Sequence, residues 1–307
     1  MSFATDVKDE ISNLTLSNSE YIAELSAFIR NNEHRINGNI VLYTENIYTA
    51  KRIYALLKRL YGIHTKMETR QNTIFNKNNV YYMEIDDKVE YVLKDLSVID
   101  DDGKYLDSPK EYIIGSDDEI KSYIRGAFLA KGSINDPKTS QYHLEFLFDK
   151  KYESVLIQRL LNSFDLNCKI LLRDNKYMVY LKDSEKIADF LKLIKAYKSV
   201  LYYENIRAYR EEKNVINRLN NCEQANIERI IQTGLNQIKD IEKIEKEVGL
   251  DILDEKLLIA ATYRKKYPES SLYELSEIIS IETDSKITKS GLNHRFRKIK
   301  EIADKIK

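Results

Sequence analysis

The most concentrated chemistry in this sequence is a basic stretch near its C-terminal end. From Ser285 to Lys300 the residues SKITKSGLNHRFRKIK include six Lys or Arg and no acidic residue, although the whole chain has 49 basic and 49 acidic residues. Lysine and arginine displace counterions from DNA phosphates, and asparagine matches the paired donor and acceptor of adenine in the major groove. The stretch therefore predicts a surface that binds duplex DNA, with a solvated basic face as the alternative.

A helix through this stretch has two different faces, since successive side chains turn by about 100°. Its apolar face consists of Leu292, Phe296, Ile299, Ile302 and Ile306. The first residues of a recognition helix usually meet base edges, a role that we predict for Thr288, Lys289, Ser290 and Asn293. Phosphate contacts are predicted for Arg297, Lys298 and Lys300, with His294 on the same arc and Arg295 beside the apolar face.

The other reactive residue types show no pattern of a catalytic or metal site. The four histidines lack metal-ligand spacing, and Cys168 and Cys222 lie far apart, as expected in a reducing cytosol. The N-terminal residues lack the apolar core of a signal peptide, and no run approaches the ~20 apolar residues of a membrane span. We therefore expect a cytoplasmic protein with no catalytic residue, metal, cofactor or membrane segment.

Three helices are predicted in residues 251–307, and they would position the basic face. They are DEKLLIAATYRKKYP, SSLYELSEIIS and TKSGLNHRFRKIKEIADKI. Ser271 and Glu274 form a capping-box pattern at the start of the second helix. Two helices followed by a turn and a third helix predict a helix-turn-helix DNA-binding domain.

The segment before this domain, residues 205–250, is polar, free of proline and predicted to be a helical linker. Gly234 is the position at which this helix would break. Polar residues recur along one side of it and are predicted to contact the neighbouring domain or phosphates: Arg210, Asn214, Asn217, Arg218 and Asn221. The alternative is a solvated helix face.

The first 204 residues repeat one order of elements, α-β-β-α-β-β-α, over residues 1–100 and 101–204. The equivalent helices LSAFIRNNE (25–33) and IRGAFLAKG (124–132) lie 99 residues apart, 124 minus 25. We predict that they pack side by side about a pseudo-two-fold axis, with Ala27 and Gly126 at the crossing. This close packing would offset the cost of a glycine inside a helix, about 1 kcal/mol relative to alanine. The alternative is two unrelated α/β segments.

The ends of these two helices are similar to the signature of LAGLIDADG homing endonucleases. In that family an acidic residue near each helix end binds a metal ion for phosphodiester cleavage. Asn32 and Lys131 occupy those positions here, so the resemblance implies degenerate former catalytic positions. Glu33 is one place further along, but the second helix has no equivalent acid.

The whole chain more specifically resembles the WhiA family of bacterial sporulation and cell-division regulators. The matching blocks are RGAFLAKGSINDP and YHLEF within 125–146, NRLNNCEQAN (217–226) and KSGLNHRFRKIKEIA (289–303). The resemblance implies a non-cleaving LAGLIDADG-like domain joined to a helix-turn-helix that binds DNA. It also implies a role in chromosome segregation, cell division and, in spore formers, sporulation.

These observations predict an α+β fold with a tandem αββαββα domain, a helical linker and an all-α helix-turn-helix domain. The leading hypothesis is a sequence-specific regulator of transcription that binds double-stranded DNA at the nucleoid, without nuclease activity. Its further partner would be another transcription regulator or a division protein. Two alternatives remain: an active endonuclease with unusual metal ligands, and a protein-interaction module of the division machinery.

Overall fold

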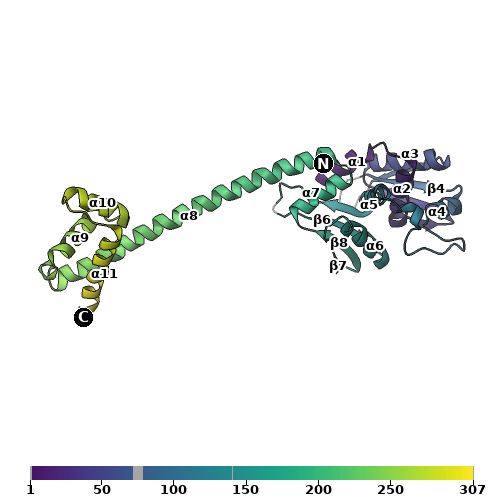
Figure 1. Ribbon diagram of the computed structural model, residues 1–307. Coiled ribbons are helices and arrows are strands. Elements are labelled where there is room, and N and C mark those ends of the chain that lie inside the picture. Colours follow the sequence, from purple (N-terminus) through teal and green to yellow (C-terminus); the bar gives the residue numbers. More distant parts are fainter. Residues whose placement is uncertain (1, 72–78, 140, 307) are drawn as a thin grey trace. The chain divides into compact units, whose positions relative to one another are not determined.

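The computed structural model describes residues 2–71, 79–139 and 141–306. The chain forms two compact units, Met1–Arg210 and Glu211–Lys307, each with its own hydrophobic core. Figure 1 follows the elements along the chain.

The first unit contains the predicted duplication. The first copy comprises α2 (Asn18–Asn32), β1 (His34–Ile36), β2 (Asn39–Thr44), α3 (Ile47–Tyr61), β3 (Lys66–Gln71), β4 (Asn79–Ile85) and α4 (Val89–Asp95). The second comprises α5 (Asp117–Lys131), β5 (Gly132–Ile134), β6 (Leu144–Phe148), α6 (Lys151–Asn162), β7 (Lys169–Arg173), β8 (Lys176–Leu181) and α7 (Ser184–Leu193). Both sheets are antiparallel and have the same strand order, β1-β2-β4-β3 and β5-β6-β8-β7. The predicted α+β fold with two αββαββα repeats is confirmed.

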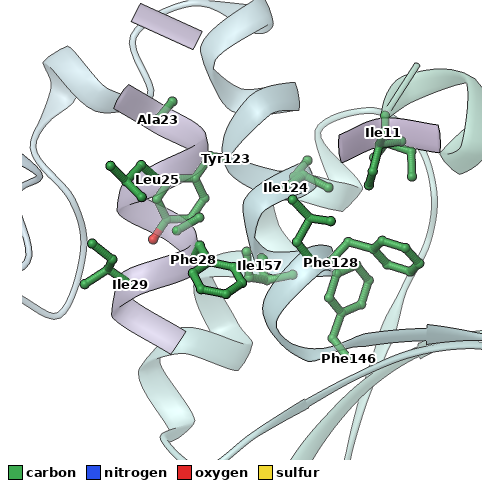
Figure 2. Packing of buried hydrophobic residues seen from close by; sticks show 14 of the residues in the cluster. Ile11, Ala23, Leu25, Phe28, Ile29, Tyr123, Ile124, Phe128, Phe146 and Ile157 are labelled. Atoms are coloured by element: carbon green, nitrogen blue, oxygen red, sulfur yellow. The ribbon is translucent and has the colours of Figure 1, made fainter. Parts of the chain in front are cut away.

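The helices α2 and α5 begin at equivalent positions, 99 residues apart (117 minus 18), and pack against each other. A Cβ atom on Gly126 would lie 2.1 Å from the carbonyl oxygen of Glu24 and 3.0 Å from the Cβ of Ala27. No larger side chain fits there without separating the helices, which confirms the predicted close crossing. Figure 2 shows Phe28 of α2 and Phe128 of α5 among the buried side chains of this core.

Buried ion pairs stabilise this helix pair, and nothing in the sequence pattern predicted them. Glu24 accepts hydrogen bonds from Arg52 of α3 and from Arg125 of α5, the latter at 3.3 Å. Arg30 pairs with Glu153 of α6 at 2.8 Å. A buried charge is tolerated when an opposite charge and hydrogen bonds compensate for lost hydration, so these pairs link α2 to its neighbours.

An N-terminal helix, α1 (Phe3–Ser12), was not predicted. It buries Phe3, Val7 and Ile11 in the core of the first unit. Their spacing of four residues is helical, but the helix is short and its docking provides most of its stability.

The helix α8 extends without interruption from Tyr197 to Glu247, so the predicted break at Gly234 is absent. Gly234 is buried, and a Cβ atom there would lie 2.3 Å from the carbonyl oxygen of Pro268. The glycine therefore permits close packing of α8 against the loop after α9 rather than ending the helix.

The second unit packs α9 (Glu255–Lys266), α10 (Leu272–Glu282) and α11 (Lys289–Lys305) against the end of α8. The predicted capping box of Ser271 and Glu274 is present at the start of α10. The core of this unit also includes Ile241 and Ile244 of α8. The compact unit thus begins at Glu211, inside the segment predicted as a linker.

Candidate nucleic-acid interface

The helix α11 is positioned by its apolar face and by the turn that precedes it. Leu292, Phe296 and Ile299 are buried in the core of the second unit, as predicted. In the turn, the backbone N–H of Ile287 donates to the hydroxyl of Ser280 over 2.9 Å, which ties α11 to α10. These contacts fix which side of α11 faces outward.

The opposite side of α11 presents the predicted basic face. Exposed residues on it are Lys289, Ser290, His294, Arg297, Lys298 and Lys300. The ion pairs within the described part of this unit involve other lysines, namely Lys246, Lys265 and Lys266. Lys289, Arg297 and Lys298 therefore remain available to an anionic ligand such as the DNA backbone, whereas Lys300 lies near Asp240.

Three of the residues predicted for DNA contact have structural neighbours that sequence reasoning missed. The hydroxyl of Thr288 caps α11 by accepting a hydrogen bond from the N–H of Gly291 at 3.1 Å. Arg295 is half-buried, and its Nη1 lies 3.5 Å from the carbonyl oxygen of Lys256. Asn293 is half-buried in a groove between α8 and α11. Any base edge that contacts Asn293 must reach into that groove.

The groove beside Asn293 has a volume of about 370 Å³. From α8 it is lined by Thr233, Asn236, Gln237, Lys239 and Asp240, and from α11 by Asn293, Phe296, Arg297 and Lys300. The Oε1 atom of Gln237 is buried and has no hydrogen-bond partner among the described residues. The end of α8 therefore forms part of the candidate interface.

The two positions predicted to be degenerate former catalytic positions, Asn32 and Lys131, lie together at the ends of α2 and α5. Asn32 and Lys131 line one depression of about 270 Å³. The side chain of Asn32 is 4% exposed and pairs with the backbone of Tyr43, donating to its carbonyl at 2.7 Å and accepting from its N–H at 2.8 Å. The N–H and the oxygen of the Asn32 amide both hydrogen-bond the backbone of β2, so the amide oxygen points at β2 rather than at a ligand.

The second position carries a cation whose carboxylate partner is shared with Lys176. The Nζ of Lys131 lies 3.3 Å from a carboxylate oxygen of Asp149. Burial opposes ionisation of Asp149, but the ammonium groups of Lys131 and Lys176 hold its pKa below the usual value. Glu33 lines the same depression. Among residues 2–71, 79–139 and 141–306, no group of three or more His, Cys, Asp or Glu is placed to hold a metal ion.

Comparison with known proteins identifies the family. Domain models match residues 18–99 (WhiA N-terminal LAGLIDADG-like domain), 120–213 (WhiA LAGLIDADG-like domain) and 216–303 (WhiA C-terminal HTH domain). The Probable cell division protein WhiA of Bacillus cereus (strain B4264) is 42% identical, and the match covers 100% of this chain and 98% of that protein. The chain belongs to the WhiA family.

Solved WhiA structures agree with the fold. Full-length WhiA from Thermatoga maritima superimposes with a TM-score of 0.59 and 25% identity, covering 100% of this chain and 99% of that one. The N-terminal LAGLIDADG domain of WhiA gives a TM-score of 0.50 at 23% identity, covering 63% of this chain and 90% of that one. The architecture of two sheets, a long helix and C-terminal helices is thus that of WhiA proteins.

The polar residues predicted along α8 of this WhiA-family chain occupy two environments. Arg210 is held within the first unit, because its Nη1 donates to the carbonyl of Pro137 at 2.7 Å and its guanidinium lies over the ring of Tyr142. Exposed residues further along α8 are Asn214, Asn217, Arg218 and Asn221. Arg210 therefore anchors a loop of the LAGLIDADG-like unit, whereas a phosphate contact by the other four stays a prediction.

Sequence reasoning missed two arginines of the WhiA HTH unit, Arg229 of α8 and Arg264 of α9. Together with Lys289 they line a pocket at the start of α10. One signal was present for Arg264, because it continues the buried face of α9 at helical spacing after Leu257 and Ala261. Finally, no helix among the described residues is long and apolar enough to cross a membrane.

Proposed function

We propose that this WhiA-family chain is a sequence-specific DNA-binding protein that regulates transcription in connection with cell division and has no nuclease activity. The observation that carries the proposal is the outward face of α11, which is basic, exposed and free of acidic residues from Lys289 to Lys300. It lies on a helix that follows α10 by a short turn, within the region matched by the WhiA HTH model.

The residues of α11 take different roles in this proposal. Lys289, Ser290 and Asn293, in the first turns, meet base edges in the major groove, with Thr288 as the helix cap beside them. Phosphate contacts come from Arg297, Lys298 and Lys300, with His294 and Arg295 at the border of the surface. Phosphate contacts supply affinity that depends on salt, whereas base-edge contacts supply specificity.

The biological role rests on the names of relatives. The homologues from Bacillus cereus and Bacillus anthracis are called Probable cell division protein WhiA. From this we infer a role in cell division, with chromosome segregation and, in a spore former, sporulation as related processes. The protein would act at the nucleoid in the cytoplasm, together with another transcription regulator or a division protein.

Loss of nuclease activity is supported by the former catalytic positions. The amide of Asn32 is committed to the backbone of Tyr43, and Lys131 repels a divalent cation while pairing with Asp149. Two-metal hydrolysis needs anionic oxygen ligands at this point. Supercoiled plasmid incubated with the protein and magnesium or manganese should therefore stay intact. Site-specific nicking that is lost in Glu33→Gln would contradict this part of the proposal.

The DNA-binding assignment is tested on the duplex that the protein selects from a random-sequence pool. At fixed salt, Asn293→Ala should cost about 1–3 kcal/mol and relax the preference at one base pair. Arg297→Ala should weaken binding to all sequences and make the salt dependence shallower. Lys246→Ala, an exposed lysine of α8, is the control. Unchanged affinity of both α11 variants would contradict the assignment.

A further inference from the structure

A second basic feature of the HTH unit lies next to α11. It is a pocket of about 250 Å³ bordered by α8, the end of α9 and the start of α10. Its lining consists of Arg229, Ile230, Thr233, Arg264, Ser270, Ser271, Leu272, Tyr273 and Lys289. Three of these side chains are cationic and none is acidic. Glu269 and Glu274 line a neighbouring depression that shares Ser270 and Tyr273 with this pocket. The carboxylate of Glu274 accepts a hydrogen bond from the N–H of Ser271 at 2.8 Å.

Arg264 is the buried member of this group. It is 1% exposed, and its Nη1 donates to the carbonyl oxygen of Ser270 at 2.6 Å. Its buried Nε–H has no hydrogen-bond partner among the described residues. Burial lowers the pKa of Arg264 to about 10, and no described carboxylate counteracts this shift. The guanidinium also lies over the ring of Phe296, 5.3 Å from its centre. The pocket thus contains a buried guanidinium that has no carboxylate partner among the described residues and keeps one free donor, an arrangement that favours an anionic ligand.

The start of α10 adds backbone donors to the same pocket. Inside this helix of 11 residues, Leu275 is the first to donate to a backbone carbonyl, that of Ser271 at 2.9 Å. The capping box uses the N–H groups of Ser271 and Glu274. The N–H groups of Leu272 and Tyr273 lie between them at the positive end of the helix dipole, where anions are stabilised.

We propose that this pocket binds a phosphate group, held by the guanidinium groups of Arg264 and Arg229 and the first N–H groups of α10. Phosphate fits this set because it offers several acceptor oxygens to arginine forks and to helix N–H groups at once. Two kinds of ligand carry such a phosphate group: the backbone of bound DNA and a free phosphate ester. The DNA source rests on the proposed function, whereas binding of phosphate itself does not.

The site is tested first with inorganic phosphate and the full chain. Arginine Nε–Hε resonances are followed by NMR during titration with phosphate, against chloride at equal ionic strength. One resonance should shift with added phosphate until the site is saturated. This resonance should be missing from the spectrum of Arg264→Lys, which assigns it to Arg264. Arg229→Glu should weaken phosphate binding by at least about ten-fold, because a carboxylate then competes for the same cations. Lys246→Ala should behave as the wild type.

The source of the phosphate is tested with Arg229→Ala on the duplex selected by the wild type. If it is a DNA phosphate, the variant binds more weakly and the slope of log K against log salt becomes shallower by about 0.9. If the variant binds DNA normally but phosphate poorly, the ligand is a free phosphate ester. Absence of both the saturable shift and the slope change overturns the proposal. Arg297→Ala still reports on the α11 interface in that case, so the two failures are distinguishable.

Discussion

Buried arginines in the two units are compensated in different ways. In the LAGLIDADG-like unit, Arg125 is fully buried and contacts the carboxylate of Glu24 at 3.3 Å. In the HTH unit, Arg264 is 1% exposed and donates to backbone carbonyls instead, such as that of Ser270 at 2.6 Å. The first cation has a carboxylate partner, which it shares with Arg52, whereas the second has no carboxylate partner among the described residues.

The same contrast extends to the surface of each unit. At the former catalytic position of α5, Lys131 pairs with Asp149. On α11, the described ion pairs of the unit leave Arg297 and Lys298 to solvent. Cations that have internal partners stabilise the fold, and cations without them are free to bind an external polyanion. The distribution of acidic partners therefore differs between the LAGLIDADG-like unit and the HTH unit of a chain with zero net charge.

The largest expected effect comes from removing the central acid of the first unit. Glu24→Gln leaves Arg52 and Arg125 buried without a counter-charge, and breaking a buried pair costs about 3–5 kcal/mol. The free energy of unfolding, measured by urea denaturation, should fall by that amount. In the control Glu185→Gln, an exposed glutamate whose half-buried partner Arg207 keeps a nearer pair with Glu204, the change should stay below about 1 kcal/mol. Equal effects in the two variants would show that burial of the pair is unimportant.

A smaller effect is expected from one glycine in each unit. Gly126→Ala places a Cβ against the carbonyl of Glu24, and Gly234→Ala places one against the carbonyl of Pro268. Each variant should lose about 1–3 kcal/mol through overpacking, despite the better helix propensity of alanine. Hydrogen exchange should show that the first substitution loosens α2 and α5, while the second loosens the HTH unit. Stabilisation by either alanine would contradict the close approach.

The smallest effect concerns single lysines and tests whether the two units differ in DNA binding. Lys298→Ala should make the slope of log K against log salt shallower by about 0.9, because one phosphate contact is lost. Lys131→Ala should leave the slope unchanged, since Lys131 is paired with Asp149. Affinity is measured by fluorescence anisotropy over a range of salt concentrations. A slope change in Lys131→Ala would place DNA at the LAGLIDADG-like unit as well.

Local sequence patterns were sufficient for much of the fold. The elements of the repeat were predicted correctly, and so were the capping box of Ser271 and Glu274 and the buried face of α11. Each of these features depends on residues that are close together in the sequence. The crossing at Gly126 was also predictable, because the duplication identified the partner helix. Similarity to WhiA motifs supplied the family, which the domain models confirm.

Other features depend on partners far apart in the sequence. Helical spacing indicated that α11 has a buried side, but not that Asn293 would lie in a groove beside Thr233 and Gln237 of α8. Gly234 was expected to break α8, yet its role is to accommodate the Pro268 carbonyl.

The balance of charge inside each unit was equally hidden. Arg125 and Arg264 each occupy a buried helix face, and neither local sequence shows that Glu24 neutralises the first while only carbonyls hold the second. Helical periodicity predicts that a side chain is buried. Whether its charge has an opposite partner depends on which charged groups the folded chain brings within a few ångströms of it. For this protein, the amino-acid pattern was enough for the architecture and the basic helix. The three-dimensional packing determined which cations keep an unbalanced charge.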